Sequence, residues 1–179
     1  MTVITRLFAT ALLATVLAPL AQASASDPHS VIQVAIERMT QRIEQDRARL
    51  TAEPGYARQV VNEELDGLVD FRRITQLVMG QYFGPSSREQ KMRFLEVFRA
   101  SLVNTYASGL TLYEGQEVRV LPAASGDIVD GRARVRTEIR TNTGSVVPVF
   151  FSLYQNREGV WMVENVIVNG LNLGRTFRT

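Results

Sequence analysis

The sequence predicts an α+β domain in which helices come first and an antiparallel sheet follows. Three observations predict this class. Apolar residues recur three and four positions apart over residues 30–110, which is the period of amphipathic helices. From Gly115 the period changes to two, which is the period of strands with one buried face. Short turn segments such as Asp130-Gly131 join the strand candidates, so neighbouring strands should pair as hairpins with helices on the sheet's inner face.

The first two helices are expected over residues 30–52 and 56–68. In both segments the apolar residues share one side, with Arg, Glu and Gln between them. The Pro54-Gly55 pair separates the segments, because proline removes a backbone donor and glycine leaves the helix readily.

A short third helix and a long fourth helix follow. Asp70 is expected to cap the third helix, over residues 71–79. Ser86 with Glu89 three residues later matches a capping box, and predicts that the fourth helix runs to about Leu110. Apolar positions are spread widely around this helix, so we expect neighbours to cover much of its circumference.

Four strand candidates occupy residues 118–121, 132–141, 146–155 and 160–168. The second alternates most regularly. One face carries Arg132, Arg134, Arg136, Glu138 and Arg140, and the other carries Ala133, Val135, Thr137 and Ile139. This alternation predicts a sheet with one face in water and the other against the helices.

Residues 1–23 have the order of a cleavable secretory signal. Arg6 precedes an apolar run over residues 7–21, and the small residues Ala21 and Ala23 form the favoured cleavage site, with a second site two residues later. The alternative, an uncleaved membrane anchor, is disfavoured because the run is shorter than the roughly 20 residues of a bilayer span. We therefore predict a periplasmic protein whose single domain spans residues 24–179.

The charge balance gives no indication of nucleic-acid binding. The chain has 20 basic and 18 acidic residues, and loss of Arg6 with the signal leaves 19 against 18, a net charge of +1. We expect no nucleic-acid partner.

Catalytic groups are scarce. The chain has no cysteine and only one histidine, His29, and no glycine-rich phosphate loop, so thiol catalysis, Ser-His triads and His-based zinc sites all lack parts. We predict no catalytic residue, metal or cofactor. The alternative is a small enzyme that uses carboxylates alone, such as Glu64 and Asp70.

Large apolar side chains on three parts of the chain are candidates for one shared wall. They are Phe71, Ile74, Leu77, Val78 and Tyr82 around the third helix; Phe94, Phe98, Leu102 and Tyr106 on the fourth; and Val147, Val149, Phe151, Trp161, Val163 and Ile167 in the sheet. Periodicity does not distinguish a solid core from a ligand cavity. The neighbouring pair Arg72 and Arg73 could meet a phosphate at a pocket mouth or simply face solvent.

Several segments of the chain resemble the MlaC family of periplasmic phospholipid-binding proteins, also called toluene-tolerance auxiliary proteins. The most specific is residues 159–173, with Trp161 in the last strand, a valine-rich stretch and Gly170-Leu171-Asn172-Leu173. Residues 79–83, 106–116, 134–139 and 151–154, and Asp70-Phe71, also match. The chain departs from the family at Met162, where lysine is common, and stops at Thr179, where most members continue into a further helical stretch.

The resemblance implies a nuclear-transport-factor-2-like or cystatin-like fold, with helices on the inner face of a curved four-stranded antiparallel sheet and a hydrophobic cavity between. It implies a monomeric carrier without enzymatic activity, for which glycerophospholipid is cargo and not a cofactor. Its acyl chains would contact the fifteen apolar residues named above, and its head group would remain near the cavity mouth. Arg72 and Arg73 are the candidate head-group residues.

The partners that the resemblance implies are an outer-membrane lipoprotein/porin complex and an inner-membrane MCE-type ABC transporter, between which the carrier maintains outer-membrane lipid asymmetry. A third reading of the chain, besides carrier and enzyme, is a docking module in which Arg132, Arg134, Arg136 and Arg140 bind an acidic partner.

Overall fold

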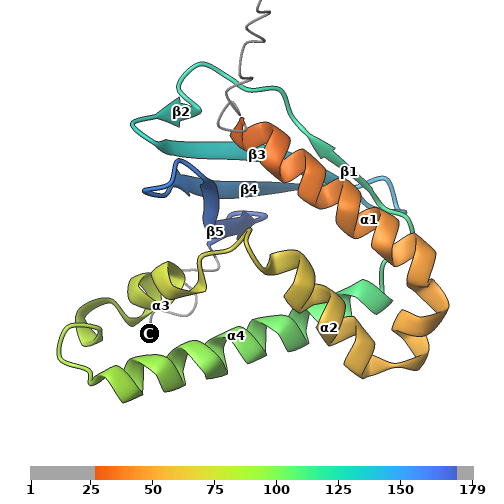
Figure 1. Cartoon of the computed structure of the whole chain (residues 1–179). Helices are drawn as coiled ribbons and strands as arrows, with labels where there is room; N and C mark the ends of the chain where they lie inside the picture. The colour runs from red at the N-terminus through yellow and green to blue at the C-terminus, as the bar shows by residue number, and fades with distance from the viewer. Residues whose placement is uncertain (1–26, 173–179) are drawn as a thin grey trace, which may run out of the picture.

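The computed structural model describes residues 27–172, so the predicted signal and its cleavage sites lie outside the described residues. Figure 1 shows the helices preceding all of the strands, which confirms the predicted α+β class. The helices are α1 (Pro28–Ala52), α2 (Pro54–Leu65), α3 (Phe71–Met79) and α4 (Arg88–Thr111), with a 3₁₀ turn, η1 (Gly80–Tyr82), after α3. Among residues 27–172, no helix combines the length and the apolar character needed to cross a membrane.

The sequence identified the helix caps correctly at α3 but not at α4. Asp70 accepts a hydrogen bond from the Arg73 backbone N–H at 2.9 Å, as predicted for the start of α3. At α4 the capping box is formed by Ser87 and Gln90, one residue later than the predicted Ser86 and Glu89. Ser86 is engaged elsewhere, since its hydroxyl donates to the Tyr82 carbonyl at 2.6 Å.

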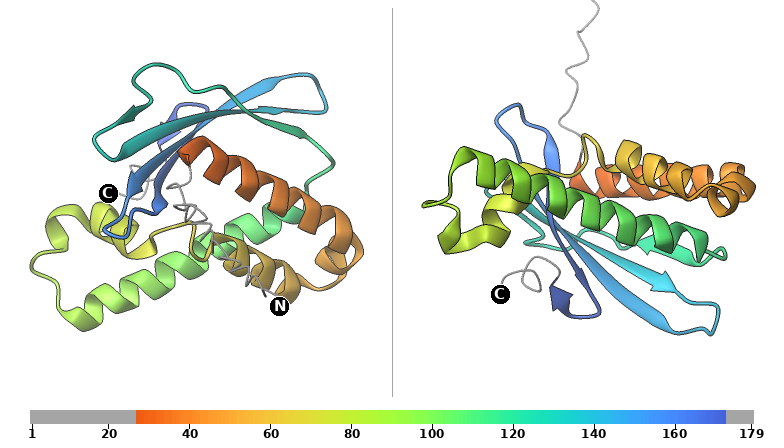
Figure 2. Two further views of the ribbon diagram at one scale, coloured as in Figure 1. Left: turned by 45° about the horizontal axis from the view of Figure 1, so that its top comes forward. Right: turned by 90° about the horizontal axis from the view of Figure 1, so that it is seen from below.

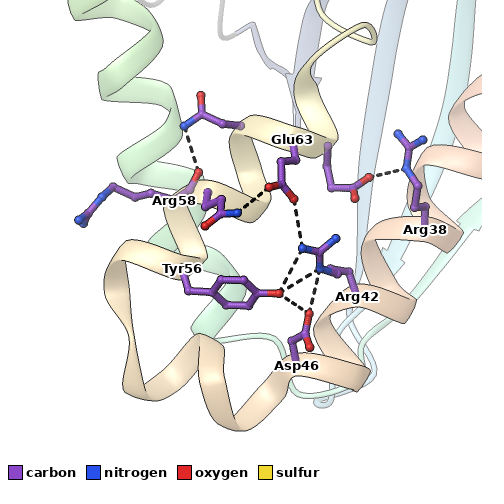
Figure 3. Close-up of polar contacts among 9 residues, drawn as sticks. Arg38, Arg42, Asp46, Tyr56, Arg58 and Glu63 are labelled. Atoms are coloured by element: carbon purple, nitrogen blue, oxygen red, sulfur yellow. Dashed lines mark hydrogen bonds and ion pairs between the residues drawn. The ribbon is translucent and has the colours of Figure 1, made fainter.

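A polar network joins α1 to α2 (Figure 3). Arg42 lies between Asp46 and Glu63, donating to them at 2.9 and 3.1 Å, and Tyr56 donates its hydroxyl hydrogen to Asp46 at 2.6 Å. Asp46 is also where α1 leaves helical geometry, with φ −108° and ψ 15°. The hydrogen bond from Tyr56, and then the bond and charge of Arg42, lower the pKa of the Asp46 carboxyl.

The sheet contains the four predicted strands and two that were not predicted. The strands are β1 (Glu117–Val120), β2 (Ile128–Val129), β3 (Arg132–Arg140), β4 (Val146–Gln155), β5 (Trp161–Val168) and β6 (Leu171–Asn172). They lie in the order β1-β3-β4-β5-β6, with β2 also on β3, and all of these pairs are antiparallel. The unpredicted β2 and β6 have two residues each, too few to show an alternating pattern.

The alternation along β3 produces the two predicted faces. Ala133, Val135 and Thr137 are buried against the helices, whereas Arg132 and Arg134 on the opposite face are exposed. One side of the sheet is therefore available to cover a hydrophobic interior.

The buried residues form two separate clusters. One joins α1, α2 and α4 around Val60, Val61 and Val103, and the other joins the start of α1 to the sheet around Ile32, Val135 and Trp161. The view from below in Figure 2 shows the helical layer and the sheet diverging, with α4 running along the open side. The space between the two clusters is where the apolar cavity described below lies.

The link between α2 and α3 fixes α3 beside β5. Val69 forms a parallel bridge with Val163, whose N–H donates to the Leu68 carbonyl at 2.8 Å. The Asp70 N–H in turn donates to the Val163 carbonyl at 3.2 Å. These backbone bonds place the capped end of α3 beside Val163, near the start of β5.

Candidate functional site

A cavity of about 450 Å³ lies between the helices and the sheet. Its lining is almost entirely apolar, and every layer of the fold contributes to it. The lining residues are Met39, Val61, Leu65, Leu68, Val69, Phe71, Ile74, Phe98, Leu102, Tyr106, Gly109, Leu110, Ile139, Val149, Phe151, Val163, Glu164, Asn165, Val166 and Val168.

One side of α4 forms the cavity's helical wall. Phe98, Leu102, Tyr106 and Leu110 recur every four residues, which places them along one face of a helix. Gly109 leaves open space in this wall, because a Cβ atom there would have no neighbour within 4 Å. From Phe98 to Leu110 this wall is about 18 Å long at 1.5 Å per residue.

The opposite wall comes from paired positions in the sheet. Val149 lies opposite Val168, and Phe151 lies opposite Val166, so β4 and β5 present their side chains to the cavity together. Ile139 of β3 continues this wall. The alternation that buries one face of the sheet thus also lines the cavity.

Eight of the fifteen apolar residues predicted from the sequence line the cavity. They are Phe71, Ile74, Phe98, Leu102, Tyr106, Val149, Phe151 and Val163. That all fifteen residues contact lipid remains a prediction. These eight, however, lie around one cavity.

The other seven predicted residues lie outside the lining. Val78 and Trp161 are buried, the latter in the cluster between α1 and the sheet, while Leu77 and Tyr82 are exposed. Phe94 stacks on Phe98 with ring centroids 5.9 Å apart, and Val147 pairs with Ile139 across the strands. Ile167 pairs with Phe150, whereas the lining residues on either side of it are Val166 and Val168.

A β-bulge explains why Ile167 is outside the lining while Val166 and Val168 are part of it. Ser152 pairs with Asn165, and the next residue, Leu153, pairs with Val163, so Glu164 has no partner across the strands. The extra residue shifts the alternation along β5 by one position. No residue pattern in the sequence marks this bulge. The lining residues of α1 and α2, Met39, Val61 and Leu65, are not among the fifteen residues predicted from the sequence.

Glu164 is the only charged side chain in the described lining. It is 8% exposed, and its two oxygens accept from Arg73 Nε at 2.5 Å and from Arg132 Nη1 at 2.7 Å. A buried carboxylate is tolerated when it is ion-paired and hydrogen-bonded in this way.

Of the two predicted head-group arginines, only Arg73 reaches this cluster. Its guanidinium lies 3.9 Å from the centroid of the Tyr154 ring, and the Tyr154 hydroxyl donates to Asp70. Burial, together with the hydrogen bond to Asp70, raises the pKa of Tyr154 to about 12. Arg72 is exposed.

The carboxylates considered for catalysis both have structural partners. Glu64 is buried and accepts a hydrogen bond from Arg38, and Asp70 uses one oxygen for the α3 cap and the other for Tyr154. Across residues 27–172, no cluster of three or more His, Cys, Asp or Glu side chains is arranged to hold a metal ion.

Three of the four arginines considered for docking are paired within the chain. Arg132 pairs with Glu164, Arg136 with Asp127 at 3.5 Å, and Arg140 with Glu117 at 3.4 Å. This pairing reduces the charge that the outer face of the sheet offers to an acidic partner.

The fold and the cavity together define a small α+β domain with a partly open apolar cavity between its helices and its sheet. The family model described as "MlaC protein" matches residues 33–179, and the chain belongs to the MlaC family.

Two relatives and one solved structure are similar to the chain. Toluene tolerance protein ttg2D of Pseudomonas putida is 34% identical over 161 residues, which are 89% of this chain and 74% of the relative. The Intermembrane phospholipid transport system binding protein MlaC of Haemophilus influenzae is 22% identical over 152 residues, 83% of this chain and 70% of the relative. A phospholipid-binding protein from Ralstonia solanacearum, solved in complex with a phospholipid, aligns with a TM-score of 0.76 and 25% identity, covering 86% of this chain and 84% of that chain.

Proposed function

We propose that this chain is a periplasmic phospholipid carrier whose cavity shields acyl chains from water. The observation that carries the proposal is the apolar cavity between α4 and the sheet, lined by one charged residue only among those described. The similar Ralstonia solanacearum protein, solved with a phospholipid, supports the choice of cargo.

The energetics require such a cavity in any carrier of this kind. Each methylene costs about 0.8 kcal/mol to expose to water, so two acyl chains of about 30 methylenes cost on the order of 25 kcal/mol. A lipid therefore leaves a bilayer rarely unless a protein covers its chains. The acyl chains would lie along the wall from Phe98 to Leu110 and against Val149 and Phe151 of the sheet.

The proposed route runs through the aqueous space between two membranes. The predicted signal would export the chain, and as a monomer it would exchange lipid with an outer-membrane lipoprotein/porin complex and an inner-membrane MCE-type ABC transporter. The relative named as part of an intermembrane phospholipid transport system supports this route. Exchange would maintain lipid asymmetry in the outer membrane.

Transport by this route needs no bond to be made or broken. Release is favoured by an acceptor that binds the lipid well or by a partner that binds the lipid-free state better than the loaded state, because only a difference in affinity shifts the equilibrium.

A transfer assay between vesicles tests the proposal. Donor vesicles carry a fluorescent phospholipid and a quencher, and acceptor vesicles carry neither. The proposal predicts that lipid-free protein speeds the appearance of fluorescence in the acceptors in proportion to its concentration, with the lipid recovered chemically intact. A rate equal to that without protein, or recovery of hydrolysed lipid, would contradict it. Leu102→Asp, which places a charge in the α4 wall, should abolish transfer, whereas Val97→Asp on the exposed side of the same helix should not.

A further inference from the structure

A charged cluster where β5 meets the start of α3 consists of Glu164, Arg73, Arg132, Tyr154 and Asp70. Of these five residues only Glu164 lines the cavity, and it also lines a hollow on the outer face of the sheet together with Arg132. Glu164 lines the cavity only because the bulge on β5 turns it there. An apolar residue at this position would avoid the cost of burying a carboxylate.

Contacts from two strands restrain the guanidinium of Arg73. Arg73 is on α3, Glu164 of β5 accepts from its Nε at 2.5 Å, and the ring of Tyr154 on β4 covers it at 3.9 Å. The Tyr154 hydroxyl donates to Asp70, the cap of the same helix, so the ring is itself held in place. Arg132 occupies the second oxygen of Glu164 at 2.7 Å.

Part of the Arg73 guanidinium is left for a ligand. An arginine has five N–H donors, and Glu164 takes the one on Nε. Within residues 27–172 the terminal nitrogens of Arg73 donate to no other residue, and its side chain is 32% exposed. The planar pair of terminal nitrogens matches two oxygens of a phosphate.

The restrained arginine is not itself in the cavity lining, but near neighbours on its helix and its ion-pair partner are. Phe71 and Ile74, its near neighbours on α3, both line the cavity, as does its partner Glu164. A lipid with its chains in the cavity would bring its phosphate to this edge.

We propose that Arg73 is the phosphate ligand of the bound lipid and that Glu164 and Tyr154 are positioning residues that hold its guanidinium ready. The proposal rests on the proposed carrier function and adds how the head group is recognised. Because the guanidinium is already ordered, binding costs less side-chain entropy than with a free arginine.

Two lipids with the same chains isolate the contribution of the phosphate. Lipid-free protein is incubated with vesicles that contain dioleoylphosphatidylcholine and dioleoylglycerol in equal amounts, and mass spectrometry measures the ratio in which the protein captures them. We expect the wild type to favour the phospholipid by about tenfold or more, the size of one charge-assisted contact. Arg73→Gln should bring the ratio close to one.

The matched control is Arg72→Gln, which removes the same charge from the neighbouring, exposed residue and should leave the ratio unchanged. Glu164→Gln should lower the ratio only in part, because the amide keeps the shape and loses the ion pair, and capture of dioleoylglycerol should stay at the wild-type level. A merely structural role for Glu164 would reduce capture of both lipids alike. Equal loss of both lipids in Glu164→Gln would therefore overturn its positioning role.

The failures of the two proposals are distinguishable. If the wild type and Arg73→Gln capture lipid in the same ratio, the role of Arg73 is overturned and the carrier function stands. If the wild type captures neither lipid, the carrier function itself is contradicted. Inorganic phosphate, titrated alone into lipid-free protein, should not bind measurably. Phosphate binding that Arg73→Gln abolishes would assign this arginine to a free anion and overturn its role toward the lipid.

Discussion

Tyr56 donates a 2.6 Å hydrogen bond to Asp46 at the residue where α1 departs from helical geometry. The bond links α1 to α2, the two helices that supply Met39, Val61 and Leu65 to the cavity lining. Arg49 covers the Tyr56 ring, with its guanidinium carbon 3.7 Å from the ring centroid. The part of the cavity lining that α1 and α2 supply therefore depends on a polar contact between these two helices as well as on apolar packing.

Tyr56→Phe tests that dependence. The variant removes one hydroxyl from a side chain that is 7% exposed, and keeps the ring beneath Arg49. We expect the free energy of unfolding in urea to fall by about 2 kcal/mol, because the hydroxyl donates to the charged Asp46 and accepts from Arg42 at 3.2 and 3.3 Å. Tyr82→Phe is the control, because Tyr82 is 60% exposed and its loss should change stability by less than about 0.5 kcal/mol. Equal stability changes in the two variants would contradict the role of the Tyr56 hydroxyl.

The same contact predicts a loss of stability in acid. The folded pKa of Asp46 lies below its unfolded value of 3.8, so the ionised carboxylate favours the folded state. Its contribution is present above that unfolded value and is lost as the pH falls through the lower folded pKa. Thermal unfolding of Asp46→Asn, followed from about pH 5 to about pH 2, should therefore show a weaker loss in acid than the wild type. Parallel curves would argue against a lowered pKa.

The raised pKa of Tyr154 predicts that the protein also loses stability at alkaline pH. Its folded pKa is about 12 and its ordinary value is 10.0, so the folded state favours the protonated phenol. The contribution is present below pH 10.0 and disappears as the pH rises toward 12. Tyr154→Phe should lose less stability across this interval, as measured by urea unfolding at a series of pH values. A wild-type phenol that titrates at its ordinary pKa by ultraviolet absorbance would contradict the prediction.

Filling the cavity should displace lipid without unfolding the protein. Val149 is 5% exposed and faces the cavity from β4, so Val149→Trp places a large ring in the space we assign to acyl chains. We expect the variant to keep a cooperative unfolding transition and to carry less than about a tenth of the wild-type lipid, by phosphate content. Val146→Trp, at an exposed position of the same strand, should carry the wild-type amount. Wild-type lipid content in a folded Val149→Trp would mean that the cavity wall is wrongly assigned.

The periodic parts of the fold could be predicted from the sequence because each depends on local spacing. The stripe that begins with Phe71 and the alternation along residues 132–140 each lie within one element, and the structure places their boundaries within a few residues of the predictions. The capping box was predicted one residue too early because Ser86 and Ser87 are adjacent in the sequence. Only the structure distinguishes them: Ser86 donates to the Tyr82 carbonyl, and Ser87 caps α4.

The candidate site was only half predictable, because its other half depends on contacts between distant residues. Glu164 pairs with Arg73 across 91 residues and with Arg132 across 32, and no spacing in the sequence encodes either distance. The bulge places Glu164 in the cavity lining. It also shifts the alternation of β5, so that Val166 and Val168 line the cavity and the predicted Ile167 does not. Alternation read from a single strand assumes an unbroken register and therefore misses such a shift.

Native mass spectrometry of protein purified from a bacterial host tests the central claim most directly. If the cavity holds phospholipid, the folded protein should be heavier than the denatured protein by the mass of a phospholipid, and Leu102→Asp should lack the additional mass while Val97→Asp retains it. A folded wild-type protein with no additional mass, which also takes up none from phospholipid vesicles, would contradict the claim.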